Sequence, residues 1–236
     1  MNIAVILAGG SGTRIGAIDT PKQFIDIYGK PLIVHTIESF DVNPNIDYIL
    51  VACKEEWIED LTIWTRQYGL NKVKWIINGG STRQESVLNS IKKLKDECSE
   101  DDVLVIHDAA RPLISQRIIN ENIEGAKKYG AVDTVIPTTD TIIKSVDSIT
   151  INSVPIRKEL YLGQTPQSFK YSIISEAHER ALKDSTLDAT DDCQLVLKQG
   201  KEVYLVEGDK LNFKVTTFED LMILKAVIKM GKLEVM

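Results

Sequence analysis

The sequence predicts an α/β fold: a single Rossmann-like domain with a mostly parallel, twisted sheet flanked by helices, plus a protruding β-hairpin arm. Short β-branched runs alternate with longer stretches in which apolar residues recur at helical spacing, which is typical of parallel strands joined by crossover helices. A glycine-rich loop follows the first of these runs. The length of 236 residues, 43% of them hydrophobic, suffices for one substantial core, so we expect residues 1–236 to form one domain.

The first strand is expected at residues 3–7, an apolar run typical of a buried parallel strand. Further β-branched runs predict strands at 48–52, 73–77, 103–107, 131–136 and 203–206. Apolar residues at helical spacing predict helices between them, including those after Pro31, around 57–64, and at 171–182, 191–199 and 221–230.

Residues 137–160 depart from this alternation. Two β-branched runs, 140–146 and 149–151, flank a polar turn at Asp147 and Ser148, which predicts a two-stranded ribbon. An isolated hairpin is only marginally stable in water, so we expect a second copy of the chain to support it in a homodimer formed through this arm. The alternative is an ordinary hairpin folded back on its own domain.

The composition argues against several classes of protein. The formal net charge of −6 disfavours a nucleic-acid partner, because binding a phosphate backbone needs a surplus of clustered Lys and Arg. No apolar run has the length of a membrane span, and the first residues lack the pattern of a secretory signal. We therefore expect no membrane partner and a cytoplasmic location. Cys53, Cys98 and Cys193 are too few and too far apart for a disulfide or zinc framework.

Unusual loops follow three of the predicted strands. The glycine-rich loop follows the strand at 3–7, residues 78–86 follow the strand at 73–77, and residues 107–112 follow the next one. In folds of this class the functional loops lie at the carboxyl ends of the strands, where helix N-termini point at the ligand. The three loops should therefore form one site.

The first loop and the residues after it predict a site for a nucleoside triphosphate. Its glycines allow backbone N–H groups to turn toward an anion. Arg14 can meet phosphate oxygens with a planar fork, and Lys22 adds a point charge. Nucleotidyl transfer depends on positioning and on stabilising charge as pyrophosphate leaves, so this pair favours a transferase. The alternatives are a surface salt bridge for Arg14 and a solvated loop lysine for Lys22.

Other phosphate-binding motifs fit less well. The loop lacks the Gly-Lys-Ser/Thr ending of a P-loop. Gly10, Gly12 and Gly16 imitate a dinucleotide fingerprint, but with different spacing, and Cys53 and Lys54 stand where a ribose-binding acid is expected. A nicotinamide oxidoreductase and a non-catalytic nucleotide-binding module remain the alternatives.

Asp108 is the candidate metal residue. A carboxylate at a strand end that faces phosphates can hold Mg²⁺, which keeps few protein ligands and several phosphate oxygens. Arg111, three residues on, could bind a second, phosphorylated substrate. The alternative is a mutual surface ion pair between the two, which would contribute little.

Six ordered motifs resemble the cytidylyltransferases that make CDP-polyols, a family that includes the methylerythritol-phosphate and ribitol-phosphate enzymes. They span nearly the whole chain: residues 7–14 with 21–24, 80–86, 107–112, 164–167, 190–192 and 213–216. The resemblance implies that CTP reacts with a polyol phosphate, in the presence of Mg²⁺, to give a CDP-polyol and pyrophosphate. It also implies that residues 137–160 are the dimer arm.

The resemblance further implies roles for individual residues. Arg14 and Lys22 would stabilise the transition state, while Arg157, from the arm, and Lys214 would orient the attacking phosphate in a site shared between subunits. The positions implied for nucleotide binding are Leu7, Ala8, Gly9, Gly10, Gly12, Thr13, Gly80, Ser81, Arg83, Ser86, Asp108, Ala109 and Thr165. The positions implied near the polyol or metal are Asp108, Arg111, Thr141, Arg157, Thr190 and Lys214, with Asp108 as the metal residue.

Different motifs favour different polyol substrates. Residues 7–10, 130–134 and 161–166 are similar to the ribitol-phosphate branch, whereas 107–111 and 190–192 are closer to the methylerythritol-phosphate branch. Within these motifs, Asp133 could bind an extra hydroxyl of a pentitol, or it could equally cap a strand. We favour D-ribitol 5-phosphate as the acceptor over 2-C-methyl-D-erythritol 4-phosphate.

Overall fold

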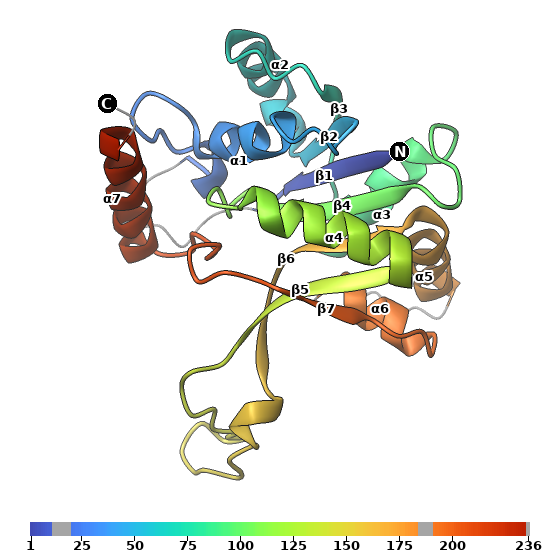
Figure 1. Cartoon of the computed structure of the whole chain (residues 1–236), viewed down its shortest axis with the longest axis vertical. Helices are drawn as coiled ribbons and strands as arrows, with labels where there is room; N and C mark the ends of the chain where they lie inside the picture. The colour runs from blue at the N-terminus through green and yellow to red at the C-terminus, as the bar shows by residue number, and fades with distance from the viewer. Residues whose placement is uncertain (11–19, 184–190, 235–236) are drawn as a thin grey trace.

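The computed structural model describes residues 1–10, 20–183 and 191–234, and places a twisted seven-stranded sheet at their centre (Figure 1). The strand order is β3-β2-β1-β4-β6-β5-β7. The strands are β1 (Asn2–Ala8), β2 (Tyr48–Cys53), β3 (Val73–Asn78), β4 (Val103–Asp108), β5 (Ala131–Pro137), β6 (Tyr161–Lys170) and β7 (Tyr204–Glu207). β1 pairs in parallel with β2 and β4, as do β2 with β3 and β5 with β7. The predicted α/β fold with a mostly parallel sheet is therefore confirmed.

The sequence prediction missed β6, which runs antiparallel to both β4 and β5. Its central residues are polar, and a proline in a run of residues argues against a strand. In the structure Pro166 follows a cis peptide bond and lies where the pairing with β5 shifts register, between Asp133 and Val135. A proline is tolerated at such an irregularity because no ladder hydrogen bond is lost there.

Helices cover both faces of the sheet (Figure 1). One face carries α1 (Leu32–Asp41), α2 (Ile58–Gln67) and α4 (Gln116–Tyr129), and the other carries α3 (Arg83–Leu94), α5 (Tyr171–Lys183) and α6 (Asp192–Lys198). The closing helix α7 (Phe218–Glu234) packs on a third apolar cluster that includes Ile27 and Leu32. Among the described residues no helix is long and apolar enough to cross a membrane.

Burial follows the strand order. Every residue of β1 and β4 is buried, because both strands lie inside the sheet with helices on either face. Side chains of β1 alternate between two apolar clusters, with Ile6 in the one that contains Phe40 and Val5 in the one that contains Ile174. This central position fixes the carboxyl ends of β1 and β4, where the unusual loops begin.

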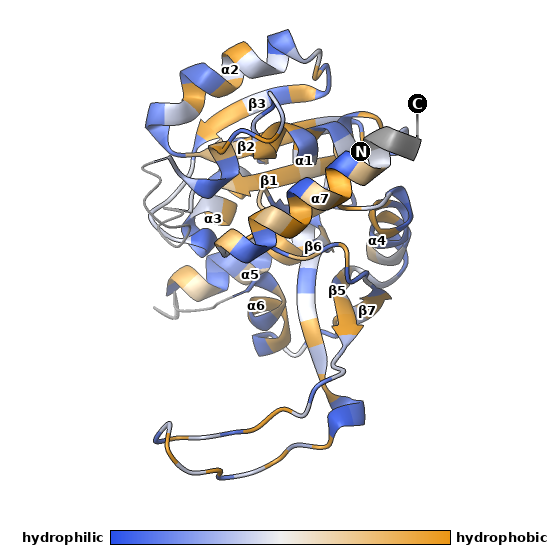
Figure 2. Cartoon of the chain, turned by 90° about the vertical axis from the view of Figure 1, so that its left-hand side faces the viewer, coloured by the Kyte–Doolittle hydropathy of each residue, from blue (hydrophilic) through white to orange (hydrophobic). Residues whose placement is uncertain are grey.

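Residues 138–160 form an arm that stands away from the body (Figures 1 and 2). The predicted turn is present, since the Asp147 carboxylate accepts hydrogen bonds from the backbone of Ile149 (2.9 Å) and Thr150 (2.8 Å). The predicted hairpin is present, but its two halves pair through one isolated antiparallel bridge, between Lys144 and Ser153, and not through the regular two-stranded ribbon that we expected. The β-branched side chains have no apolar face to pack on in this chain, so a regular ladder gains little from them.

Candidate functional site

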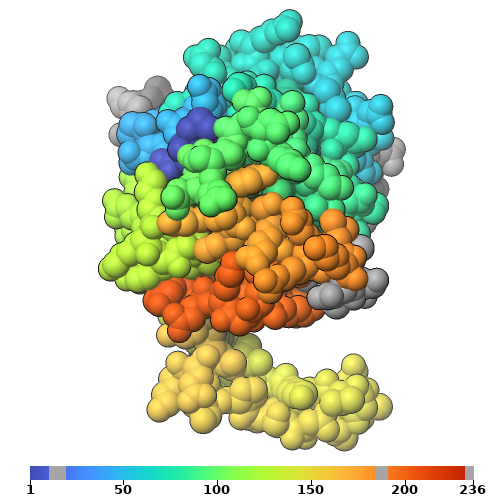
Figure 3. Space-filling model, turned by 90° about the vertical axis from the view of Figure 1, so that its right-hand side faces the viewer, coloured from blue at the N-terminus to red at the C-terminus, as the bar shows by residue number. Residues whose placement is uncertain are grey.

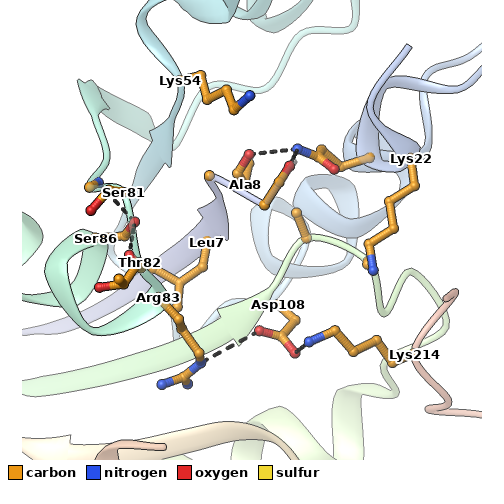
Figure 4. Close-up of a pocket in the computed structure, with 16 residues that line it drawn as sticks. Leu7, Ala8, Lys22, Lys54, Ser81, Thr82, Arg83, Ser86, Asp108 and Lys214 are labelled. Atoms are coloured by element: carbon orange, nitrogen blue, oxygen red, sulfur yellow. Dashed lines mark hydrogen bonds and ion pairs between the residues drawn. The ribbon is translucent and has the colours of Figure 1, made fainter. Parts of the chain in front are cut away.

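A cavity of about 510 Å³ opens at the carboxyl ends of β1 and β4 and beside the loop after β3 (Figure 4). The three loops singled out in the sequence meet there, as the strand order requires. The residues that line the cavity and were candidates are Leu7, Ala8, Gly9, Gly10, Lys22, Gly80, Ser81, Arg83, Ser86, Asp108, Ala109 and Lys214. Sequence reasoning missed Gln23, Lys54, Thr82 and Ala110, which also line it.

One wall of the cavity is made of closely approaching backbone. The Ser86 hydroxyl accepts a hydrogen bond from the Gly80 N–H (2.9 Å) and donates one to the carbonyl of Thr82 (2.9 Å). A Cβ at Gly9 would lie 3.1 Å from Ser86 Oγ, and one at Gly80 would lie 2.3 Å from Glu85. This wall therefore presents backbone groups and leaves no room for side chains, which suits close contact with a flat or anionic ligand.

The loop after β3 is fixed by the start of α3. Thr82 caps that helix by accepting a hydrogen bond from the Glu85 N–H (3.0 Å). The Glu85 carboxylate in turn accepts hydrogen bonds from the backbone N–H and the hydroxyl of Ser81, both at 2.7 Å. These bonds hold the pKa of Glu85 below its usual value. The helix start thus keeps Ser81 at the rim of the cavity.

The start of the first loop, at Ala8 and Gly10, is held by Gln23, which is 2% exposed. Its side-chain amide donates to the carbonyls of Ala8 (2.7 Å) and Gly10 (2.9 Å). The next residue, Phe24, stacks on Trp57 with ring centroids 4.1 Å apart. Gln23 and Phe24 therefore anchor the short helix Lys22–Phe24, whose first residue lines the cavity.

Charge gathers around Asp108 at the end of β4. Lys214 Nζ lies 2.8 Å from its carboxylate, Arg111 Nε 3.7 Å and Arg83 Nε 3.8 Å. Burial alone would raise the pKa of Asp108, but the charges of Lys214 and Arg83 outweigh it and hold the pKa well below the usual range. The carboxylate is therefore ionised. In Figure 4, Lys22 and Lys214 extend from different segments toward the side of the cavity where Asp108 lies.

A second layer of polar residues supports Asp108 from beneath the cavity. Thr165 Oγ1 accepts a hydrogen bond from the Asp108 N–H and contacts His107 Nδ1, both at 3.1 Å. Burial lowers the pKa of His107 to about 4, so the ring is neutral. Arg111 donates to the carbonyl of Asn212 (2.7 Å) and is buried. Thr165 and Arg111 thus position the cavity floor without lining it. The ion pair weighed for Arg111 and Asp108 is present, but it is buried and not at the surface.

Behind Arg83 lies a further polar group. The Gln167 amide donates to Asp133 (3.1 Å), and its carbonyl accepts from Arg83 (3.2 Å). Burial raises the pKa of Asp133 to about 7, and nearby Asp191 adds to the effect. Asp133 does not line the cavity.

Some candidates are not brought to the cavity. Thr141 and Arg157 lie on the arm, where Arg157 donates to the carbonyl of Thr139 (3.2 Å); Figure 3 shows the arm standing clear of the body. The remaining candidates lie outside the described residues: Gly12, Thr13, Arg14 and Thr190.

The chain matches one family over nearly its whole length. The model of the 2-C-methyl-D-erythritol 4-phosphate cytidylyltransferase family matches residues 2–230. The chain belongs to this family. It is therefore a cytidylyltransferase, a nucleotidyltransferase enzyme, and neither a nicotinamide oxidoreductase nor a nucleotide-binding module without activity.

Solved structures of similar proteins agree with this family. A 4-diphosphocytidyl-2C-methyl-D-erythritol synthase from Anaerococcus prevotii is 27% identical over 97% of this chain and 96% of its own, with a TM-score of 0.83. The 2-C-methyl-D-erythritol 4-phosphate cytidylyltransferase from Thermus thermophilus is 30% identical over 95% and 98%, with a TM-score of 0.75. Its counterpart from Francisella tularensis is 29% identical over 94% and 97%, with a TM-score of 0.80.

These comparisons favour the methylerythritol alternative and give no support to the preference for D-ribitol 5-phosphate. The structure gives that preference no support either. Asp133, the residue considered for binding an extra hydroxyl of a pentitol, accepts a hydrogen bond from Gln167 and does not line the cavity.

Proposed function

We propose that the protein transfers the cytidylyl group of CTP to the phosphate of 2-C-methyl-D-erythritol 4-phosphate and releases pyrophosphate. The observation that carries the proposal is the placement of Lys22, Arg83 and Lys214 around one cavity that Gly9 and Gly80 also line. The cations suit a triphosphate, and the closely approaching backbone at the two glycines suits contact with a base and ribose. Family membership supplies the reaction class, and the relatives' acceptor supports the choice of polyol.

The nucleotide lies across the cavity in this proposal. Its base contacts the backbone around Gly80 and Ser81, where hydrogen-bonding groups are close and a larger purine has less room. Its triphosphate lies toward Lys22, which also neighbours the first loop. The resemblance implies that Arg14, which lies outside the described residues, adds a second cation for the triphosphate.

The chemical step is an in-line attack by an acceptor phosphate oxygen on the α-phosphorus of CTP. The new P–O bond forms as the bond to the β-phosphate breaks, and the electron pair leaves with pyrophosphate. Lys22 neutralises the charge that develops on the phosphoryl oxygens. Lys214, held by Asp108 before ligands bind, orients the attacking phosphate.

The donor set at Asp108 fits a magnesium ion that arrives with the nucleotide. Among the described residues, Asp108 is the only carboxylate that lines the cavity, and they contain no cluster of three metal-ligating side chains. Mg²⁺ with few protein ligands takes the rest from phosphates and water. Asp108 would hold it, and when bound it would neutralise triphosphate charge.

We also propose that the arm joins two copies of the chain. Val146 and Ile149 are 78% and 88% exposed. A second copy that covers these apolar side chains would remove their surface from water, which favours association. Arg157 and Thr141 would then act at the partner's cavity, because the arm that carries them stands away from the body of its own chain (Figure 1).

The test is pyrophosphate release from CTP and Mg²⁺, with 2-C-methyl-D-erythritol 4-phosphate and D-ribitol 5-phosphate supplied in parallel. We expect release with the methylerythritol compound at a kcat/KM well above that with ribitol phosphate. A higher kcat/KM with ribitol phosphate would overturn the acceptor, and no release with either compound would overturn the reaction.

A further inference from the structure

A buried ion cluster lies directly behind the cavity and joins three helices. His178, on α5, places Nε2 3.0 Å from one carboxylate oxygen of Asp192, at the start of α6. The other oxygen of Asp192 lies 2.5 Å from Nη1 of Arg83, at the start of α3. The side chains of His178 and Asp192 are each 1% exposed, whereas Arg83 reaches the cavity.

Asp192 is an ionised group in an apolar setting. Burial alone would raise its pKa, but the charge of Arg83 and the hydrogen bond from His178 outweigh this and hold the pKa below its usual value. Burying an ion pair costs desolvation that an apolar group of similar size would avoid. The cluster therefore calls for an explanation other than packing.

The donors of Arg83 show what the cluster achieves. Nη1 donates to Asp192 and Nη2 to Gln167 (3.2 Å), so each outer nitrogen is held from behind through one of its two N–H groups. Nε faces Asp108 at 3.8 Å, which is too far for a hydrogen bond. The guanidinium is therefore held back from Asp108, and the Asp108 carboxylate keeps its close contact with Lys214.

We infer that the buried His178–Asp192 pair is a positioning unit that holds the Arg83 guanidinium at the nucleotide end of the cavity and off Asp108. Without the Asp192 charge, the nearest anion to Arg83 is Asp108. The guanidinium then pairs closely with Asp108 and no longer binds the ligand. It also competes with Lys214 for the Asp108 carboxylate, so the contact between Asp108 and Lys214 weakens. This inference rests on the proposed function only in placing CTP in this cavity.

The test measures the dissociation constant of CTP by calorimetry, because binding is observed whether or not an acceptor reacts. We expect Asp192→Asn and His178→Leu each to raise the constant about tenfold, the lower end of what loss of a supporting partner costs at metal sites. His178→Gln retains an N–H that can reach Asp192, so its constant should stay within about threefold of the wild type.

Two controls separate positioning from general destabilisation. Asn122 is as deeply buried and hydrogen-bonds to Thr134 (2.8 Å) and Ser168 (3.0 Å), on contacts that do not involve Arg83. Asn122→Ala should lower the unfolding temperature and leave CTP affinity unchanged. In an Arg83→Met background, His178→Leu should no longer weaken CTP binding, because the residue through which it acts is gone.

A failure of this inference can be distinguished from a failure of the proposed function. The inference is overturned if His178→Leu and His178→Gln bind CTP equally well, or if the loss is the same in the Arg83→Met background. Either result leaves pyrophosphate release by the wild-type enzyme unaffected. Conversely, a wild type that releases no pyrophosphate with either acceptor, but shows the Arg83-dependent loss of CTP affinity, would overturn the proposed function and support the positioning unit.

Discussion

The cavity and the arm differ in where their polar groups find partners. In the cavity, Asp108 forms an ion pair with Lys214, which lies more than one hundred positions later in the sequence, and Arg83 forms one with Asp192. In the arm, the carboxylate of Asp147 bonds only to residues two or three positions away. The cavity is thus specified by contacts within one chain, whereas the arm has local contacts and exposed apolar side chains. The described cavity residues are therefore held by long-range contacts within the chain, whereas the exposed apolar side chains of the arm support the proposal that a second copy covers them.

The largest effect should come from the cavity side of this comparison. Removing the Lys22 charge by Lys22→Ala should lower kcat by about 10²–10³-fold, as for other groups that stabilise transition-state charge, with a much smaller change in CTP affinity. Steady-state kinetics and calorimetry measure the two quantities. Equal losses in both would mean that Lys22 only binds the nucleotide.

The arm should respond to changes that leave the body intact. Replacing Ile149 by Asp should dissociate the homodimer without lowering the unfolding temperature, because this side chain contacts nothing in its own body. Mass measurement by light scattering and a thermal scan test this. Ile63→Asp, at an exposed isoleucine of α2 in the body, is the matched control for the same substitution away from the arm. A wild-type chain that is already monomeric would contradict the proposed role of the arm.

The backbone wall allows a finer test within the cavity. Gly9→Ala places a Cβ 3.1 Å from Ser86 Oγ, whereas Gly10→Ala meets nothing within 4 Å. We expect the first substitution to weaken CTP binding about tenfold, equivalent to about 1.4 kcal/mol, and the second to weaken it less. Similar losses at both positions, measured by calorimetry, would show that the close approach is unimportant.

The smallest effect concerns Asp133, behind the cavity. Its pKa in the folded chain is about 7, against 3.8 for an ordinary aspartate. The folded state therefore binds the proton more tightly, and stability falls as the pH rises from about 4 to about 7. Asp133→Asn should remove this loss and raise the unfolding temperature by about 2–4 °C at pH 8, the shift that 1 kcal/mol gives a chain of this size.

The matching measurement at pH 4 tests the sign of that effect. There Asp133 holds its proton in the folded chain, so the variant should gain little over the wild type. A gain that is equal at pH 4 and pH 8 would show that the substitution acts through packing and not through the carboxylate charge.

Much of this organisation could be predicted from the sequence because it follows from local patterns. The alternation of β-branched and helical runs predicts the parallel strands, and the strand ends bring Gly9, Ser86 and Asp108 to one edge. Strand β6 could not be predicted, because its polar residues are explained only by partners distant in the sequence. Thr165, for example, can be buried because its hydroxyl finds partners in Asp108 and His107.

The same limit applies to the supporting residues of the site. Nothing local distinguishes Gln23 as the residue that fixes the carbonyls of Ala8 and Gly10, or His178 as a partner of Asp192. Each is one polar residue among many until the fold places its partner beside it. The arm shows the opposite limit, because its β-branched sequence predicts a ribbon that this chain alone does not stabilise.

In the proposed reaction, this cavity joins the cytidylyl group of CTP to methylerythritol phosphate. The most direct measurement is a competition in which the enzyme receives CTP, Mg²⁺ and equal concentrations of 2-C-methyl-D-erythritol 4-phosphate and D-ribitol 5-phosphate, with the products identified by mass spectrometry. The product ratio reports the ratio of kcat/KM for the two acceptors. We expect the CDP-linked methylerythritol to predominate. A mixture dominated by CDP-ribitol would contradict the proposed acceptor, and the absence of any CDP-linked product would contradict the proposed reaction.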